Sequence, residues 1–598
     1  MNDRFDKTYG CWLGKCIGGS AGAAVEGYKK YIDRNFLETM RPDLPNDDLD
    51  LQLLWFDVLT EKGLSLRAED LAEAWKERCW YPFSEYGIFL RNYDRGILPP
   101  LSGSFENPLF HDGEGSPIRS EIWATVFPGK PEKAAWYAKM DSSLDHSGDA
   151  SDIEAFYAAA ESMAFERVDI RGILMEASAY LACGGRARAC ADLVFSFASS
   201  RSWLSMRNEV FRLFGHNDFT NSVTNLGIVL VALLAGEGNM EKTIDICYRS
   251  GYDTDCTCAT AAAFLGILHG ASAIPQKLKD LVGDAFVCGI NIRNSNRSIR
   301  KLAEEVYAFS QNPKEGVRPE SVITVSYKGD PVIGPGLDCS VCINVENRLP
   351  YVRKGMLCLS EIPKDWICTW SAKEISVNPG CSVTVENVLS LSSGIRMLRE
   401  KNLLALQWED EKTTFGVVGA SVWRVRGAYF EALDKPLALG IPSPHGEGSV
   451  LPSPECMVNN IAFLDKPYGN ANDPAILMVS PTNMIAIETA FPWFVGQGLW
   501  YAKTTIRSPE ERDVWMVVGN NDGFSVSLNG KVVLKEDAIR LWTPYNNAAI
   551  VHLREGANQL ELTLLRRTEH LRFSLDWRYY EGEHYHRKPY LTDLSCEW

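Results

Sequence analysis

The stretch Gly10-Cys-Trp-Leu-Gly-Lys-Cys-Ile-Gly-Gly-Ser-Ala-Gly-Ala-Ala-Val-Glu-Gly27 decides the fold of the N-terminal half. Its glycines at positions 10, 14, 18 and 22 would form a ridge without side chains on one face of a helix. Glycine lowers helix stability, so a regular glycine ridge predicts that another backbone packs very close to this helix. Glu26 follows where the helix should end, a position at which a carboxylate is unfavourable beside the helix dipole. We interpret Glu26 either as an exposed loop residue or as a residue with a functional role.

Helical patterns continue from this stretch to about residue 315. Segments with apolar residues at helical spacing, many of them rich in alanine, predict helices at residues 49–60, 68–77, 153–165, 226–234 and 257–269. Residues 311–319 contain two prolines and a glycine, and we expect them to be a linker. The sequence therefore predicts an all-α domain over residues 1–315.

The remainder of the chain has the pattern of β-structure. Short alternating runs between turn residues predict strands at residues 321–327, 382–385, 415–418 and 514–518, and Asn529-Gly530 is a typical hairpin turn. We expect an immunoglobulin-like β-sandwich over residues 320–395. A β-rich region should follow over residues 396–598, with a jelly-roll at about residues 495–580. Modules of this kind either bind sugars or serve only in structural packing, and the fold class is therefore multidomain, all-α followed by all-β.

Acidic residues gather at the predicted starts of two helices. Asn46-Asp-Asp48 precedes the helix at residues 49–60, and Asp253-Thr-Asp255 precedes the small-residue helix at residues 257–269. Adjacent carboxylates repel one another unless a cation lies between them, and their oxygens are ligands that suit Mg²⁺ or Ca²⁺. Either cluster taken alone could be ordinary N-capping. Two acidic helix starts in one chain favour a shared metal site.

Bulk properties limit the classes of partner. The 598-residue chain has a formal net charge of −16, and an acidic surface repels nucleic acid and anionic lipid. The first residues lack the pattern of a signal peptide, and no apolar run is long enough to span a membrane. The 16 cysteines lie mostly in apolar segments, and Cys256 and Cys258 lack a second Cys or His pair for structural zinc. We expect a cytoplasmic protein with no nucleic-acid or membrane partner, and a homo-oligomer remains open.

The motifs of the N-terminal half occur in an order that resembles the ADP-ribosylglycohydrolase family, over roughly residues 5 to 310. The glycine ridge ending at Glu26, the Asn-Asp-Asp helix start and the Asp-Thr-Asp helix start carry this resemblance. Segments between them are similar to one large branch of the family, namely Arg91-Asn-Tyr-Asp-Arg-Gly-Ile-Leu-Pro-Pro-Leu-Ser-Gly103, Pro117-Ile-Arg-Ser-Glu-Ile-Trp-Ala-Thr-Val-Phe-Pro-Gly129 and Asp145-His-Ser-Gly-Asp149.

The resemblance implies an orthogonal all-α fold around a two-metal site, where activated water cleaves a ribose C1 bond. It implies a divalent-metal cofactor, Mg²⁺ first, with Ca²⁺ or Mn²⁺ as alternatives. By the same resemblance Glu26 and Asp48 are the candidate catalytic residues. The implied metal ligands are Asn46, Asp47, Asp48, Asp253 and Asp255. The implied substrate-binding residues are Asn92, Ser102, Arg119, Glu121, His146 and Asp149, although Arg119 could instead form a surface salt bridge and His146 could be a solvent-exposed loop residue.

Three positions depart from the pattern of the family members that cleave ADP-ribose. Asn46 stands where a threonine usually opens the first metal motif, Cys256 where a threonine closes the second, and Gly19 where an aspartate is common. Asparagine can offer a carbonyl ligand, but a thiol matches Mg²⁺ poorly. These departures put one metal site and the ADP-ribose substrate in question.

The loop His111-Asp-Gly-Glu-Gly-Ser116 bears on the substrate. Asp112 and Glu114 would repel a diphosphate, which favours a neutral sugar or oligosaccharide. The sequence therefore predicts a metal-dependent glycohydrolase acting on a neutral carbohydrate. Two alternatives remain open: a hydrolase of ADP-ribosylated protein or of another ADP-ribose derivative, and a sugar-binding protein without activity.

Overall fold

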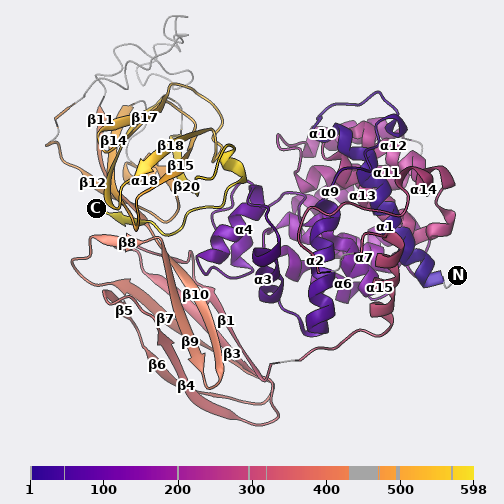
Figure 1. Cartoon of the computed structure of the whole chain (residues 1–598), viewed down its shortest axis with the longest axis horizontal. Helices are drawn as coiled ribbons and strands as arrows, with labels where there is room; N and C mark the ends of the chain where they lie inside the picture. Colours follow the sequence, from indigo (N-terminus) through magenta and orange to yellow (C-terminus); the bar gives the residue numbers. More distant parts are fainter. Residues whose placement is uncertain are drawn as a thin grey trace, which may run out of the picture. The chain divides into compact units, whose positions relative to one another are not determined.

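A computed structural model of the chain describes residues 3–45, 47–197, 201–293, 296–317, 319–429, 469–470, 472–492, 498–567 and 570–598, with only the backbone of Asp47. The chain divides into two compact units (Figure 1). One contains Met1–Glu85 and Pro99–Arg318, and the other contains Tyr86–Leu98 and Pro319–Trp598. Helices make up the first unit and sheets most of the second, so the predicted fold class is confirmed.

Each predicted helix lies in a helix of the structure, with ends that differ by a few residues. The helices are α1 Asp3–Gly22, α2 Asp47–Lys62, α3 Ala68–Arg78, α4 Ser84–Asp94, α5 Ser120–Val126, α6 Pro131–Ser142, α7 Asp149–Ala164, α8 Ile170–Ala177, α9 Arg186–Ser196, α10 Trp203–Phe214, α11 Ser222–Gly236, α12 Met240–Ser250, α13 Thr254–His269, α14 Gln276–Val282 and α15 Ile299–Gln311. None of the described helices combines the length and the apolarity that crossing a bilayer requires.

The glycine ridge of α1 packs directly against the backbone of α13, as predicted. A Cβ atom added at Gly14 would lie 2.3 Å from the carbonyl oxygen of Ala262, and one at Gly18 would lie 2.2 Å from that of Cys258. At the end of the ridge, the Thr254 hydroxyl donates a 2.8 Å hydrogen bond to the carbonyl oxygen of Gly22. The last turn of α1 therefore meets the first turn of α13, which places Glu26 near the Asp-Thr-Asp motif.

The first β module consists of two sheets around one apolar core. One sheet has the order β1-β3-β7-β5, and the other has the order β2-β10-β9-β4-β6. The burial pattern of strand β3 shows how a sheet of this module faces the core. Its residues from position 339 to 345 alternate between buried and half-buried, as expected when only one face of a sheet meets the core. The strands are β1 Ser321–Tyr327, β2 Val332–Ile333, β3 Cys339–Asn347, β4 Arg353–Ser360, β5 Trp366–Cys368, β6 Ala372–Val377, β7 Ser382–Leu391, β9 Lys401–Trp408 and β10 Glu411–Gly419.

The second β module has an eight-stranded and a four-stranded sheet around a second core. The first contains β8 Met397–Arg399, β11 Ser421–Tyr429, β12 Ile476–Ser480, β14 Gly498–Ser508, β16 Phe524–Leu528, β17 Lys531–Glu536, β19 Gly556–Arg566 and β21 Ser595–Glu597. The second contains β13 Met484–Ala486, β15 Arg512–Asn520, β18 Asn547–Leu553 and β20 Arg572–Tyr579, and a short helix α18 Ile487–Ala490 follows β13. Strands β16 and β17 form the hairpin predicted at Asn529-Gly530.

The boundary between the β modules differs from the one expected at residue 395. Strands β9 and β10 pair with strands of the first module, while β8 pairs with β21 of the second. We therefore propose that the first module ends at Gly419. Residues Tyr86–Leu98, expected in the helical domain, belong to the β-rich unit, where Arg91 forms a 3.0 Å ion pair with Asp576.

Candidate metal centre

The segment after α1 forms backbone hydrogen bonds with the segment between α12 and α13, and this pairing places Glu26 near the Asp-Thr-Asp motif. The amide of Tyr252 donates to the carbonyl of Tyr28 at 2.8 Å, and the amide of Gly27 donates to the carbonyl of Tyr252 at 2.9 Å. Gly251 has a φ of +71°, and a Cβ atom there would lie 2.3 Å from the oxygen of Tyr28. Glycine is therefore required at this crossing, which brings the ends of α1 and α12 together.

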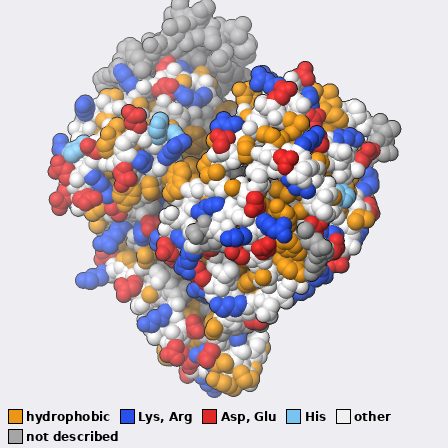
Figure 2. All heavy atoms as spheres, turned by 45° about the vertical axis from the view of Figure 1, so that its right-hand side comes forward, with side chains coloured by type: hydrophobic (Ala, Val, Ile, Leu, Met, Phe, Trp, Pro, Cys, Tyr) orange, Lys and Arg blue, Asp and Glu red, His pale blue; other side chains and the backbone are white. Residues whose placement is uncertain are grey.

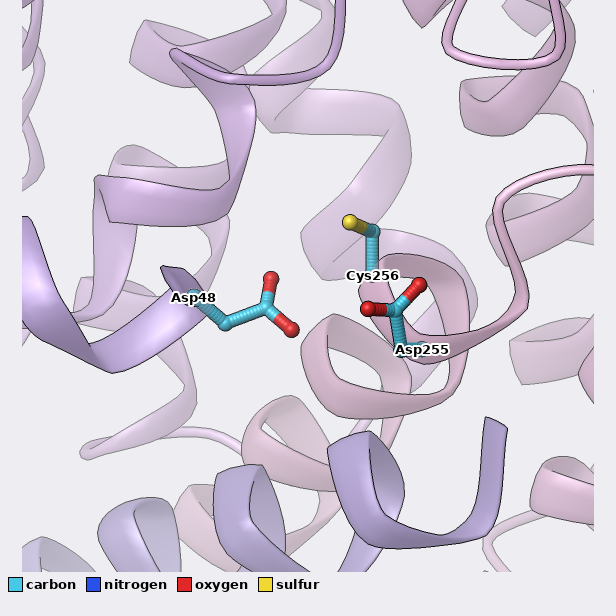
Figure 3. A group of neighbouring side chains, drawn as sticks. All are labelled: Asp48, Asp255 and Cys256. Atoms are coloured by element: carbon cyan, nitrogen blue, oxygen red, sulfur yellow. The ribbon is translucent and has the colours of Figure 1, made fainter. Parts of the chain in front are cut away.

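Asp48, Asp255 and Cys256 form the first group of potential ligands (Figure 3). Asp48 comes from the first turn of α2, whereas Asp255 and Cys256 come from the first turn of α13. One ligand atom of each residue lies within 4.8 Å of the ligand atoms of the other two. Figure 3 shows the two carboxylates facing each other across a narrow space.

Glu26, Asp253 and Asp255 form the second group, with the same upper distance of 4.8 Å between ligand atoms. Asp255 therefore belongs to both groups and could bridge two ions. The structure thus brings Glu26, Asp48 and Asp253 each close to Asp255, and their role as metal ligands stays a prediction. The predicted ligand Asn46 lies outside the described residues, as does the side chain of Asp47.

A buried lysine that the sequence analysis missed lies beside Asp48. The Lys15 ammonium is 2.8 Å from a carboxylate oxygen of Glu121 and 3.6 Å from Asp48, and none of these side chains is exposed to solvent. The amide of Gln52 donates to the other Glu121 oxygen at 3.0 Å. Glu121, predicted to bind substrate, is therefore the counter-ion that fixes Lys15. The sequence signal was Lys15 itself, the one lysine between Gly10 and Gly22, because a cation buried within a glycine ridge needs an anionic partner.

Glu114 is the second residue that sequence analysis did not assign to the centre. It is 1% exposed, and both of its carboxylate oxygens are buried without a hydrogen-bond partner among the described residues. Burial, followed by repulsion from Asp48, raises the pKa of Glu114 well above its usual value. A buried carboxylate of this kind, within electrostatic reach of Asp48 and Asp253, is favourable only with a proton or a nearby cation.

Burial and mutual repulsion raise the pKa values of the carboxylates of the centre. Burial, with Asp255 and Glu121 adding to it and Lys15 opposing it, raises the pKa of Asp48 to about 7. Burial and then the charge of Glu26 raise the pKa of Asp255 to about 6. Burial followed by Asp255 and Glu26 raises the pKa of Asp253 well above its usual range. A divalent cation would relieve this repulsion, so the donor set fits the metal that the motifs imply.

The stability of the metal-free protein should therefore fall as the pH rises from about 4 to about 7. In this window the unfolded chain has released the Asp48 proton, at a pKa of about 3.9, while the folded protein still holds it. The Asp48→Asn variant has no such proton to lose. The difference between the melting temperature of the variant and that of the wild type should increase between about pH 5 and about pH 7.5. Mg²⁺ should reverse the loss of stability with rising pH in the wild type only. A difference that is independent of pH would contradict the pKa shift.

Arg119 and His146 lie in a second buried network rather than on a surface. Arg119 is unexposed and forms ion pairs with Asp145 at 2.8 Å and Asp141 at 3.0 Å. The Nδ1 atom of His146 lies 2.9 Å from Asp145, and its Nε2 atom lies 3.7 Å from Glu85. The expected alternatives, a surface salt bridge and an exposed histidine, are therefore wrong, because carboxylates from neighbouring elements surround both residues. A substrate-binding role for them stays a prediction.

The remaining predicted substrate residues make local structural contacts. The Ser102 hydroxyl donates to the carbonyl of Leu144 at 2.7 Å, and Asn92, in the β-rich unit, accepts from Arg95 at 2.6 Å. Asp149 accepts a hydrogen bond from the amide of Ala187 at the start of α9.

Ser151-Asp-Ile-Glu154 has the spacing of a capping box in the sequence, but it does not cap helix α7. Helix α7 begins at Asp149 with Gly148 as its N-cap, so Ser151 lies inside the helix. Glu154 is buried and accepts a hydrogen bond from Ser116. The capping-box spacing was present in the sequence, but the buried partner Ser116 comes from a distant segment that the spacing does not reveal.

A model of the ADP-ribosylglycohydrolase family matches residues 1–315, which confirms the resemblance found in the sequence. No curated protein matches the chain. Among solved structures, an anti-sigma factor domain-containing protein from Clostridium clariflavum is 10% identical over 43% of this chain and 84% of that chain, with a TM-score of 0.16. An α-xylosidase from Xanthomonas citri is 9% identical over 47% of this chain and 27% of its own, with a TM-score of 0.16. TM-scores this low carry no information on fold or function.

Proposed function

Because the chain belongs to the ADP-ribosylglycohydrolase family, we propose that it is a metal-dependent glycohydrolase with its centre at Asp48, Asp253 and Asp255. The observation that supports this most is the convergence of carboxylates from segments about 200 residues apart on the shared Asp255. Buried carboxylates in repulsive contact cost stability, so a cation that holds them together gives their arrangement a physical reason. Oxygen ligands suit Mg²⁺ first, with Ca²⁺ or Mn²⁺ as alternatives.

In this proposal the exposed and the buried carboxylates of the centre have different roles in hydrolysis. A divalent ion, when bound, would orient sugar hydroxyls and polarise water. Glu26 is the exposed member, and in this proposal it accepts the proton of the attacking water. Asp48 and Asp255, whose carboxylates converge from two helices, stabilise positive charge that develops on the sugar ring. Asn46 and Asp47 would add ligands at the same helix start.

A neutral carbohydrate is the substrate class that the charges favour. Glu114 adds a further buried carboxyl group within electrostatic reach of Asp48 and Asp253, and in its ionised form, beside a bound cation, it would repel a diphosphate. The loop that carries Glu114 is fixed to the start of α11, because Asp112 accepts from the Asn221 amide at 2.9 Å. The second candidate, hydrolysis of an ADP-ribosyl bond, is favoured by the family match itself.

Hydrolysis assays across substrate classes test this choice. The full-length protein with Mg²⁺ or Mn²⁺ should release sugar from at least one neutral glycoside in a broad panel, and should release negligible ADP-ribose from modified arginine or serine. Glu26→Gln should lower kcat by about 100-fold, since it removes the proposed base but keeps the shape of the side chain. Efficient ADP-ribose release together with an inactive glycoside panel would promote the second candidate. Inactivity on every substrate would favour a sugar-binding protein without activity.

We also propose that the protein acts in the cytoplasm on a small molecule or an oligosaccharide. Fifteen described cysteines are free thiols, which is typical of a reducing compartment. Acidic and basic side chains are interspersed on the face shown in Figure 2, and the net charge of −16 disfavours nucleic acid as a partner. A homo-oligomer is compatible with these features.

A further inference from the structure

Cys256 lies in the centre, but the proposed hydrolysis gives its thiol no role. It is 7% exposed, and its sulfur lies within 4.8 Å of ligand oxygens of Asp48 and Asp255 (Figure 3). Cys258, two residues further along α13, instead contacts the backbone carbonyl of Ile244 at 3.7 Å. The two cysteines share a helix and are both buried, but only Cys256 belongs to the ligand group.

We propose that Cys256 is a metal ligand and that the position formed with Asp48 and Asp255 binds a borderline transition-metal ion, Zn²⁺ in preference to Mg²⁺. This inference rests on the proposed metal centre but not on any particular substrate. Thiolate sulfur favours Zn²⁺, whereas Mg²⁺ takes oxygen ligands almost exclusively. Three protein ligands with one open position are also the arrangement of catalytic zinc sites.

The distances allow this ligation with side-chain movement alone. Zinc binds sulfur at about 2.3 Å and carboxylate oxygen at about 2.1 Å, so two ligand atoms of one ion lie roughly 3.5 Å apart in a tetrahedral site. Atoms that are within 4.8 Å of one another need to close by about 1 Å, which rotations of three short side chains supply. On binding, the sulfur–metal bond replaces the S–H bond, and the proton leaves to solvent.

The surrounding charges favour a dication at this position. Lys15, 3.6 Å from Asp48, opposes a cation there, but its ion pair with Glu121 at 2.8 Å offsets part of its charge. The position would then present two carboxylates and a thiolate to the ion. The second group, Glu26, Asp253 and Asp255, offers only oxygen and remains suited to Mg²⁺ or Mn²⁺. The two positions therefore differ in the class of ion that each prefers.

Cobalt substitution in the full-length protein tests the assignment by spectroscopy. Co²⁺ added to the chelator-treated wild type should produce the intense near-ultraviolet charge-transfer band that a cobalt–thiolate bond gives. The band should disappear in Cys256→Ser and persist in the matched control Cys258→Ser. It should also persist in Asp253→Asn, which changes only the oxygen position. Zn²⁺ affinity should fall about 100-fold in Cys256→Ser, while Mg²⁺ affinity should change little.

A second measurement keeps the proposal falsifiable if Cys256→Ser does not fold. In the wild type, Zn²⁺ should protect Cys256 from alkylation by iodoacetamide in mild denaturant, and Mg²⁺ should not. Cobalt binding without a thiolate band, a band that survives in folded Cys256→Ser, or alkylation that is equally fast with Zn²⁺ would each overturn the assignment. These results would leave the glycohydrolase proposal intact on oxygen ligands. Conversely, a thiolate band in a protein that hydrolyses no glycoside would support the ligand assignment and contradict the proposed function.

Discussion

The Asp255→Asn variant should lose hydrolytic activity by about 100-fold or more, because Asp255 belongs to both ligand groups. The same change should raise the melting temperature of the metal-free protein. Burial and the charge of Glu26 raise the pKa of Asp255 to about 6, so at neutral pH its charged form costs folding energy that a neutral amide does not. Opposite changes in activity and in stability would separate a ligand from a residue needed only for folding.

An exposed aspartate serves as the control for this variant. Asp192 lies on α9, is 57% exposed at its side chain and pairs only with Arg188 four residues earlier among the ion pairs of the described residues. Asp192→Asn should leave kcat unchanged and alter the free energy of unfolding by about 0.5 kcal/mol or less. Activity in Asp255→Asn above half of the wild-type value would show that neither ligand group is needed for catalysis.

Alanine at Gly14 or at Gly18 should each destabilise the protein by about 3 kcal/mol or more. The added Cβ atom would lie 2.3 Å from the oxygen of Ala262 or 2.2 Å from that of Cys258, so the backbones of α1 and α13 must move apart. In an isolated helix the same substitution is stabilising by about 1 kcal/mol, so the sign of the effect reports tertiary packing. Urea unfolding of the full-length protein measures this change.

Gly172 on α8 provides the matched control for the glycine variants. The three atoms nearest to a Cβ atom there belong to the ends of the flexible side chains of Asp169 and Arg167. Gly172→Ala should therefore be neutral or stabilising by up to about 1 kcal/mol. Equal effects at Gly14 and at Gly172 would disprove the close contact between α1 and α13.

The parts of the fold that local patterns determine were predictable from the sequence. The glycine ridge required a close neighbour, and the small-residue helix α13 supplies it. The end of the first β module was not predictable, because β9 and β10 join it through pairing with the distant strands β4 and β2. Periodicity shows that a segment forms a strand, but it does not reveal which sheet the strand enters.

Some residues of the candidate site were likewise predictable from the sequence, and others were not. Asp48 and Asp255 were predictable because acidic residues at helix starts are visible in the sequence. The environments of Arg119 and His146 were not, because Arg119 pairs with the distant Asp141 and Asp145, and His146 lies beside Glu85 from another element. Lys15 and Glu114 were missed for a related reason: each is explained only by a partner or a cavity that folding creates.

Calorimetric titration of divalent ions into the metal-free protein tests the central claim most directly. The wild type should bind Mg²⁺, Mn²⁺ or Zn²⁺, and its melting temperature should rise with ion concentration as binding to the native state requires. Asp255→Asn should bind these ions much more weakly at every position. The account would be contradicted if no divalent ion bound to the wild type, or if Asp255→Asn bound ions with undiminished affinity.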